Sequence, residues 1–406
     1  MRPGSKRLSA CLLAGVLGLA GCATTQTLPP LHPGDLLHDE RFDPPSAPVA
    51  TAGDVFALSP PMRAFIRGNA EFLKGSRVAG ERQALIDALY SRYMLKLEYE
   101  ASKTRDAAEA FEARRGNCLS LVIMTAAFAH ELGLPVRFQS VQIDDAWSRS
   151  GDLSFGAGHI NLSLGYAGRT SATRGFSVEA DTMIVDFVPA AMLIGQRSIV
   201  VDETTVAAMF MNNRAAELLG DGHLQDAYWW ARQAMLTQPR YFAAYNTLAV
   251  IYRRHGDTLA AEAALSRVLA HEPGNLSAQS NRVLVLRDLG RNSEADRLQA
   301  QLRETQPHPP FYFFDNGVLA MARGDYETAR ADFQKEIDRA AYYHEFHFWL
   351  ALANYALGDY SDARKQVALA LENSTTARDH DIYTAKLGWL DAHKPAKPSA
   401  SSMQRW

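Results

Sequence analysis

The feature that most constrains the fold of this chain is a repeat of 34 residues in its second half. Glycines and alanines recur at that step, each alanine five residues after its glycine, and prolines close the first three units in the same register. Such regular spacing places the small residues at equivalent points of successive structural units. The repeated residues are Gly222, Gly256, Gly290, Gly324 and Gly358; Ala227, Ala261, Ala295, Ala329 and Ala363; and Pro239, Pro273 and Pro307.

These small residues predict a stack of helix pairs, because two helices approach closely at an alanine and a glycine lets the chain turn between them. The pattern resembles the tetratricopeptide repeat. The resemblance implies five repeats over residues 208–375 and an all-α solenoid. A capping helix is expected over residues 376–393, with Trp389 and Leu390 covering the last repeat.

Tetratricopeptide arrays present the first helix of each pair on a concave surface that holds a peptide or protein segment, so a protein partner is expected there. One equivalent position on these helices carries polar residues in the first units and aromatic residues in the last two. Asparagine can hydrogen-bond an extended backbone, and an aromatic ring can accept an apolar side chain. The alternative is that the two phenylalanines pack between helices. The residues are Asn212, Asn246, Ser280, Phe314 and Phe348.

The amino terminus has the pattern of a targeting segment. Three basic residues precede an apolar core, Leu8 to Leu19, that is too short to span a bilayer. The core ends in the sequence LAGC, which resembles the lipobox of bacterial lipoproteins. The resemblance implies a signal peptide over residues 1–21, lipidation of Cys22 and attachment to a membrane. Ala23 after the cysteine favours the periplasmic face of the outer membrane, and an ordinary signal peptide is the alternative.

Composition predicts how the ends of the mature chain behave. Residues 22–53 are rich in proline and lack apolar periodicity, so they are interpreted as an extended tether. Residues 394–406 are interpreted as a disordered tail. The formal net charge of −3 and the lack of a long basic run argue against nucleic-acid binding.

Between the tether and the repeats, residues 54–200 have the pattern of an α+β domain, with helices first and strands after them. The helix that opens at Leu119 is expected to end at Gly133, because Pro135 blocks its continuation. The polar segment Trp147–Gly158 is interpreted as a variable loop, with a mobile lid as the alternative. The predicted helices are Met62–Leu73, Glu81–Leu95, Lys103–Arg114 and Leu119–Gly133, and the predicted strands are Val136–Ile143, His159–Leu164 and Met183–Val188.

One cysteine remains in the folded body of the chain. Of three cysteines, Cys11 leaves with the signal peptide and Cys22 carries the lipid, so Cys118 has no disulfide partner within the chain. It follows a Gly-Asn turn and begins a helix, where free backbone N–H groups stabilise a thiolate or an oxyanion. A small buried hydrophobic residue is the alternative interpretation of Cys118.

A thiol nucleophile needs a base, and His159 is the candidate. His130 lies on the same helix as Cys118, roughly 18 Å away at 1.5 Å per residue, and is too distant. The imidazole in turn needs an acceptor, and Asp186 lies in an apolar strand where an unpaired acid would be costly. Asp181 is the alternative acceptor.

Residues 100–190 resemble the bacterial transglutaminase-like domain of the papain-like cysteine clan. The resemblance rests on RGNC at residues 115–118, on the helix ending in Gly-Leu-Pro, and on a histidine and an aspartate in successive strands. It implies Cys118 as nucleophile, His159 as general base and acid, and Asp186 as the orienting acid. The Cys118 N–H would serve the oxyanion. The second donor is open, with Tyr93 and Tyr99 as guesses.

The fold expected for the whole chain is therefore an α+β transglutaminase-like (papain-like) domain followed by an all-α tetratricopeptide-repeat solenoid. Asn117 and Leu119 flank the cysteine, where calcium-dependent proteases of the superfamily carry acidic residues, so no metal and no cofactor is expected. The favoured hypothesis is an envelope-anchored cysteine hydrolase or peptidase acting on a peptide or protein amide. The alternatives are a non-catalytic adaptor that binds proteins through its repeats and a transamidating enzyme.

Overall fold

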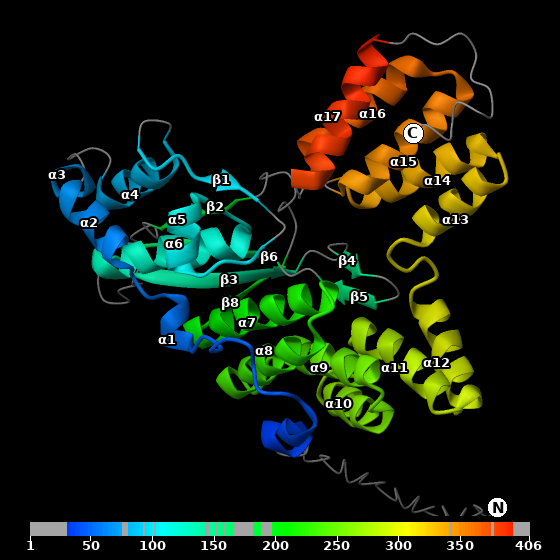
Figure 1. The fold of residues 1–406 in the computed structure, drawn as a ribbon, viewed down its shortest axis with the longest axis horizontal. Coiled ribbons are helices and arrows are strands. Elements are labelled where there is room, and N and C mark those ends of the chain that lie inside the picture. The colour runs from blue at the N-terminus through cyan, green and yellow to red at the C-terminus, as the bar shows by residue number, and fades with distance from the viewer. Residues whose placement is uncertain are drawn as a thin grey trace, which may run out of the picture. The chain divides into compact units, whose positions relative to one another are not determined.

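The computed structural model of the chain describes residues 31–74, 80–91, 94–100, 103–142, 147–150, 153–156, 159–165, 182–187, 197–341, 343–374 and 377–392 (Figure 1). The predicted signal peptide, the lipidation site Cys22 and the predicted tail all lie outside these residues. No helix in the described part of the chain combines the length and the apolar character that a membrane crossing requires.

Residues 31–53 pack on the repeat helices, so the prediction of an extended tether is wrong for this stretch. The Phe42 ring stacks on Tyr228 with 3.8 Å between ring centroids. The Tyr252 hydroxyl donates a hydrogen bond of 2.7 Å to the carbonyl oxygen of Leu36. The prolines indicated an extended chain, but the buried side chains of Leu36 and Phe42 hold it against the repeats. This part contains η1 (Pro33–Leu36), η2 (Asp39–Arg41) and α1 (Ala52–Val55).

A four-stranded antiparallel sheet, in the order β7–β6–β3–β8, follows in the chain. All three strands predicted from the sequence are present, and one further strand, β8, completes the sheet. Alternate residues of β6 (Ile160, Leu162 and Leu164) are fully buried in the core that also contains α6. The strands are β3 (Val136–Gln142), β6 (His159–Leu164), β7 (Met183–Val185) and β8 (Arg197–Val201).

A single apolar helix, α6 (Cys118–Glu131), packs against β3 and β6 (Figure 1). Every residue from Leu119 to Ala129 is buried. The helix ends as predicted, because Gly133 adopts a φ of +72° and Pro135 follows it. The other helices of this part are α2 (Pro60–Gly68), α3 (Ala70–Leu73), α4 (Gly80–Tyr90) and α5 (Ala107–Ala113).

Two small pairs of strands precede the elements that carry Cys118 and His159. The parallel pair consists of β1 (Glu98–Tyr99), which precedes α5, and β2 (Arg115–Gly116), which lies directly before α6. The antiparallel pair β4 (Trp147–Ser150) and β5 (Leu153–Gly156) lies before β6. The segment Trp147–Gly158 was predicted as a loop, and this is wrong for β4 and β5, whose backbone pairing the glycine-rich composition concealed.

The residues from 203 to 374 form five helix pairs with the predicted register. All five register glycines have positive φ, between +73° and +95°, and end the first helix of each pair. All five register alanines are fully buried, as close helix packing requires. The helices are α7 (Glu203–Gly220), α8 (Leu224–Thr237), α9 (Phe242–His255), α10 (Thr258–His271), α11 (Leu276–Asp288), α12 (Asn292–Thr305), α13 (Tyr312–Ala322), α14 (Tyr326–Arg339), α15 (His344–Leu357) and α16 (Tyr360–Glu372).

The hydrophobic core changes at the third pair, where Val283, Leu286 and Ala295 form a small cluster of their own. One continuous core runs from the sheet and α6 into the helices up to α11, where it includes Val285. A separate core begins at Phe311 and contains Phe314, Phe333 and Phe346. Phe311 itself has a left-handed φ of +65°, which marks an interruption in the regular backbone before α13.

The helix expected at the end of the array corresponds to α17 (Ala377–Ala392). Tyr383 and Leu390 are buried against residues of α15 and α16, including Tyr355 and Val367. Trp389 is partly buried at the same surface. These apolar side chains cover the outer face of the last pair.

Candidate active site

The first turn of α6 places Cys118 at a helix amino terminus. Asn117 caps the helix, with its Oδ1 accepting a hydrogen bond of 2.9 Å from the backbone N–H of Ser120. Gly116 must be a glycine, because an added Cβ would lie 2.6 Å from the Cβ of Ser120. Cys118 is a free, partly exposed thiol. The local sequence therefore presents this sulfur at the start of a rigid, buried helix.

The strands β6 and β7 bring a histidine and an aspartate together. Nε2 of His159 lies 2.7 Å from Oδ1 of Asp186. The Asn161 side-chain amide donates a hydrogen bond of 2.8 Å to the other carboxylate oxygen, Oδ2. His159 is almost fully buried, with 5% of its side chain exposed, and Asp186 is 13% exposed. Both carboxylate oxygens are thus occupied, and the ring orientation is defined.

The electrostatics of His159 link it to Cys118. Burial of the ring acts to lower the pKa of His159. Hydrogen bonds to Asp186 and to Cys118, together with the Coulombic interactions with these two residues, outweigh burial and raise the pKa of His159 to about 9. Because Nε2 faces Asp186, Nδ1 is the ring atom left to meet the sulfur.

The structure therefore brings Cys118, His159 and Asp186 into one contiguous group of side chains. A thiol, an imidazole and a carboxylate in this order can support nucleophilic acyl transfer. The catalytic role itself stays a prediction. The alternative acid Asp181, the residue Tyr93 and the side chain of Tyr99 lie outside what the structure describes.

Sequence reasoning missed Asn161, which holds the second oxygen of Asp186. A signal was present, because Asn161 lies two residues after His159 and so projects from the same face of β6. Asn161 was not singled out because the face of a strand is informative only once the neighbouring strand is known.

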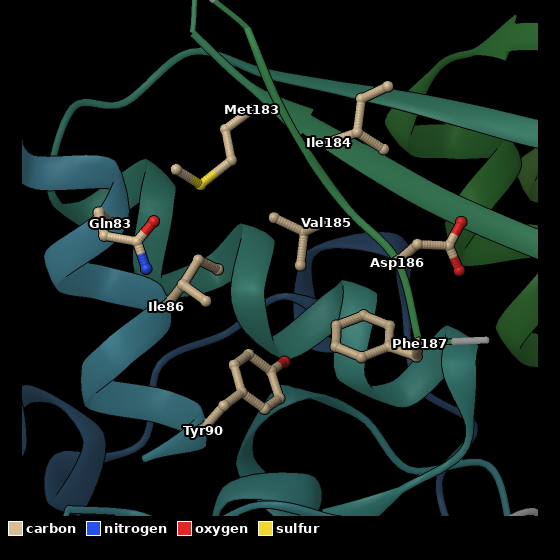
Figure 2. A pocket seen from close by; sticks show the side chains of 8 residues that line it. All are labelled: Gln83, Ile86, Tyr90, Met183, Ile184, Val185, Asp186 and Phe187. Atoms are coloured by element: carbon tan, nitrogen blue, oxygen red, sulfur yellow. The ribbon is translucent and has the colours of Figure 1, made fainter. Parts of the chain in front are cut away.

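A pocket of about 380 Å³ lies beside β7 (Figure 2). Figure 2 shows the side chains of Met183 and Val185 on one side of the strand, toward α4, and the carboxylate of Asp186 on the other. Neither Cys118 nor His159 lines the pocket. The pocket is therefore an apolar recess behind the acid, separate from the sulfur. Its lining residues are Gln83, Ile86, Tyr90, Met183, Ile184, Val185, Asp186 and Phe187.

The asparagines proposed for peptide contact lie inside the repeat array. Asn212 and Asn246 are 8% and 6% exposed. Oδ1 of Asn246 accepts a hydrogen bond of 2.9 Å from Nδ2 of Asn281 on the next pair. The partner of Asn246 is thus Asn281, one residue beyond the aligned Ser280. The amide of Asn246 connects neighbouring repeats, whereas Oδ1 of Asn212 is buried without a hydrogen-bond partner among the described residues. Little of either side chain is left exposed for a peptide.

The two phenylalanines pack between helices, the alternative that the sequence left open. Phe314 is 4% exposed and lies against Phe333 and Phe346. The Phe348 ring centroid lies 5.1 Å from that of Tyr383 on α17. Peptide contact through Phe314 is wrong for this structure, because helix packing buries its ring.

Metal ligands are not clustered in the part of the chain that the structure describes. No group of three or more histidine, cysteine, aspartate or glutamate side chains there is placed to hold a metal ion.

A tetratricopeptide-repeat family model matches residues 246–306 and 314–378. The chain therefore contains tetratricopeptide repeats, and the matched ranges run from α9 to the start of α17. A search of curated proteins found no match. The matches do not reach residues 54–200, so the relation of that part to transglutaminase-like domains remains a prediction.

Solved structures similar to the chain include two tetratricopeptide-repeat proteins and pilF of Pseudomonas aeruginosa. A tetratricopeptide-repeat protein from Parabacteroides merdae is 15% identical, with 47% of this chain and 75% of that chain covered and a TM-score of 0.30. The pilF protein of Pseudomonas aeruginosa is 17% identical, with 47% of this chain and 87% of that chain covered and a TM-score of 0.28. A tetratricopeptide-repeat protein of Thermus thermophilus is 17% identical, with 46% of this chain and 100% of that chain covered and a TM-score of 0.29. TM-scores this low carry no argument about the fold of the whole chain.

Proposed function

We propose that this chain is a protein-interaction scaffold, whose tetratricopeptide repeats hold a protein partner. The observation that carries the proposal is the match of residues 246–306 and 314–378 to the repeat family. Stacked helix pairs of this kind form extended surfaces suited to peptide and protein segments. Each repeat contributes an equivalent helix, so one segment of a partner can contact several repeats at once.

The helix α13 supplies an exposed apolar surface for such a partner. Tyr312 and Leu319 are 40% and 57% exposed. They lie seven residues apart, and therefore on the same face of the helix. Apolar side chains of a partner would lose water-exposed surface there, which is favourable by about 25 cal/mol per Å².

Site-specific photo-crosslinking tests the scaffold in the full chain. A photoreactive residue at position 319 is expected to give a discrete crosslinked protein. The matched control is position 259. Leu259 is 76% exposed, but it lies on α10, the second helix of its pair. Tyr312→Ser should reduce the crosslink formed at position 319. Identical products from positions 319 and 259 would show that α13 is not the contact surface.

A second candidate function is acyl transfer at Cys118, favoured by the hydrogen bond of 2.7 Å between His159 and Asp186 and by the contact of His159 with the thiol. In this proposal the Cys118 thiolate attacks the carbonyl carbon of a peptide or protein amide. The new C–S bond forms, and the C–N bond breaks as the His159 imidazolium gives its proton to the departing amine. A thioester remains on the cysteine.

Deacylation uses the same residues. His159 takes a proton from water as the water oxygen attacks the thioester carbonyl carbon and a C–O bond forms. The C–S bond then breaks, which releases the carboxylic acid and the Cys118 thiolate, and the proton stays on the His159 imidazolium. An amine in place of water would give transamidation by the same route. The Cys118 N–H lies at the start of α6, where backbone donors have no helical acceptor, and suits the oxyanion. Asp186, held by Asn161, keeps the imidazolium oriented.

Labelling with a peptidyl chloromethyl ketone, read by mass spectrometry, tests this chemistry. Wild type should be labelled at Cys118, and Cys118→Ser should not. His159→Ala should slow labelling by about a hundredfold, the usual size of a general-base effect. Equal and slow labelling of wild type and His159→Ala would exclude activation of the thiol by His159.

We also propose that the chain is a cell-envelope lipoprotein, attached through Cys22 to the periplasmic face of the outer membrane. The support is the LAGC sequence after a short apolar core. Metabolic labelling with an alkyne fatty acid should mark the wild-type chain and Cys118→Ser but not Cys22→Ser. Retention of the label in Cys22→Ser would place the lipid elsewhere or make the label nonspecific.

A further inference from the structure

A network of polar groups connects the first turn of α6 to α7, the first helix of the repeats. The Asn117 side-chain amide donates a hydrogen bond of 2.8 Å to Oγ1 of Thr104. The backbone N–H of Thr104 donates one of 2.7 Å to Oε1 of Glu217. Asn213 also approaches Oγ1 of Thr104, with its Nδ2 at 3.3 Å. Both Glu217 and Asn213 belong to α7.

Ser120 of α6 adds two further hydrogen bonds to this network. The Ser120 hydroxyl donates a hydrogen bond of 2.9 Å to Oδ1 of Asn117 and accepts one of 2.7 Å from the backbone N–H of Arg105. Thr104 and Ser120 are 1% and 0% exposed. Because these groups are buried, loss of one partner leaves another polar group unsatisfied, which costs about 1–3 kcal/mol. The network is therefore held in one geometry.

Glu217 is the part of this network that the repeats supply. Its Oε1 accepts from Thr104, and its Oε2 lies 2.8 Å from Nη1 of Arg214, one turn earlier on α7. Each carboxylate oxygen is thus directed to a different element. The arginine fixes the side chain on α7, and the side chain in turn fixes the backbone at Thr104.

We infer that Glu217 and Asn213 are positioning residues for Cys118, so that the first repeat forms part of the support of the reactive thiol. The inference rests on the proposed acyl-transfer function of Cys118. The path is short: α7 holds Thr104, Thr104 holds the Asn117 amide, and Asn117 caps the turn that begins with Cys118. A shift in this path moves the sulfur relative to His159.

The test measures the rate of Cys118 alkylation by iodoacetamide in the full chain between pH 5 and 10. Glu217→Leu removes the acceptor for Thr104 and should lower the rate below pH 7 by about tenfold, because a thiol displaced from its imidazole loses activation. Glu217→Gln keeps an acceptor oxygen and should restore most of the wild-type pH profile. A role in folding alone would lower the melting temperature without changing that profile.

The matched control is Glu262→Leu, since Glu262 is also a partly buried carboxylate, paired with Arg282 at 2.8 Å, but lies on α10 in the second repeat. It should leave the alkylation profile unchanged. Thr104→Val, which keeps the backbone N–H but removes Oγ1, provides a second variant if Glu217→Leu fails to fold, and it should show the same loss of rate. A wild-type profile in folded Glu217→Leu or Thr104→Val would overturn the inference.

The same experiment separates this inference from the function on which it rests. If wild type and His159→Ala have identical profiles, Cys118 is not activated, and both the proposed chemistry and the inference fail. If wild type is faster than His159→Ala while Glu217→Leu matches wild type, the chemistry stands and the inference alone is wrong.

Discussion

The first two repeats and the last two share one sequence pattern but have different surroundings. In both, the register glycines take positive φ and the register alanines are fully buried. The core of α7–α10 is continuous with α6 and the sheet, and Phe42 of the amino-terminal segment packs on it. The cores of α13–α16 are separate and rich in phenylalanine, tyrosine and tryptophan.

The difference shows that a repeat pattern determines how a helix pair forms but not what the pair packs against. In α7, residues such as Asn213 and Glu217 are used for contacts with the part of the chain that carries Cys118. In α13, Tyr312 and Leu319 remain exposed. The early repeats are thus joined to the candidate active site, whereas the late repeats have cores of their own.

The largest expected effect is in the late repeats. Phe333 is fully buried, so Phe333→Ala should lower the stability of α13–α16 by about 3–5 kcal/mol. Hydrogen exchange read by mass spectrometry should show faster exchange in these helices only, with Cys118 alkylation unchanged. Faster exchange in α7–α10 as well would mean that the early and late repeats unfold together, which would contradict their description as separate cores.

Phe42→Ala tests the connection of the amino-terminal segment to the early repeats. Loss of the stack on Tyr228 should cost about 3 kcal/mol and release residues 31–46. Limited proteolysis should then cut this segment faster. The comparison variant is Phe348→Ala on α15, which should leave cleavage before residue 50 at the wild-type rate. Unchanged proteolysis in Phe42→Ala would mean that other contacts hold the segment.

The pH dependence of stability should reside in the early part of the chain. The pKa of His159 is raised from 6.5 to about 9, so its protonated ring stabilises the fold fully below pH 6.5. That stabilisation, up to about 3 kcal/mol, is lost as the pH rises through 9. Urea unfolding at pH 6.5 and 9.5 should show that the difference in free energy of unfolding between wild type and His159→Gln is smaller at the higher pH. An equal difference at both pH values would contradict the contacts of His159 with Asp186 and Cys118.

The smallest effect concerns the interruption before α13. Glu336 is 2% exposed, and its carboxylate accepts hydrogen bonds from the backbone N–H groups of Phe311 and Phe313. Glu336→Gln removes the charge and one acceptor and should cost about 1–2 kcal/mol in thermal unfolding. Glu327→Gln breaks an exposed pair with Arg330 and should cost less than about 0.5 kcal/mol. Equal costs would show that Glu336 is not needed to start α13.

Much of the candidate site could be predicted, because its residues carry local signals. A cysteine after Gly116 and Asn117 marks a helix start, and His159 and Asp186 lie in recognisable strands. The support around them could not be predicted. Asn161 and Glu217 matter only through partners that lie 25 and 113 residues away in the chain.

The sequence by itself determined the 34-residue register, because each glycine and alanine acts within its own helix pair and repeats the same short-range packing. Only the tertiary structure decided which pairs join the rest of the chain. The stack of Phe42 on Tyr228 and the bond from Thr104 to Glu217 depend on two surfaces meeting in space. Such contacts are stabilised by mutual burial of both partners, and a local pattern in either segment alone does not encode them.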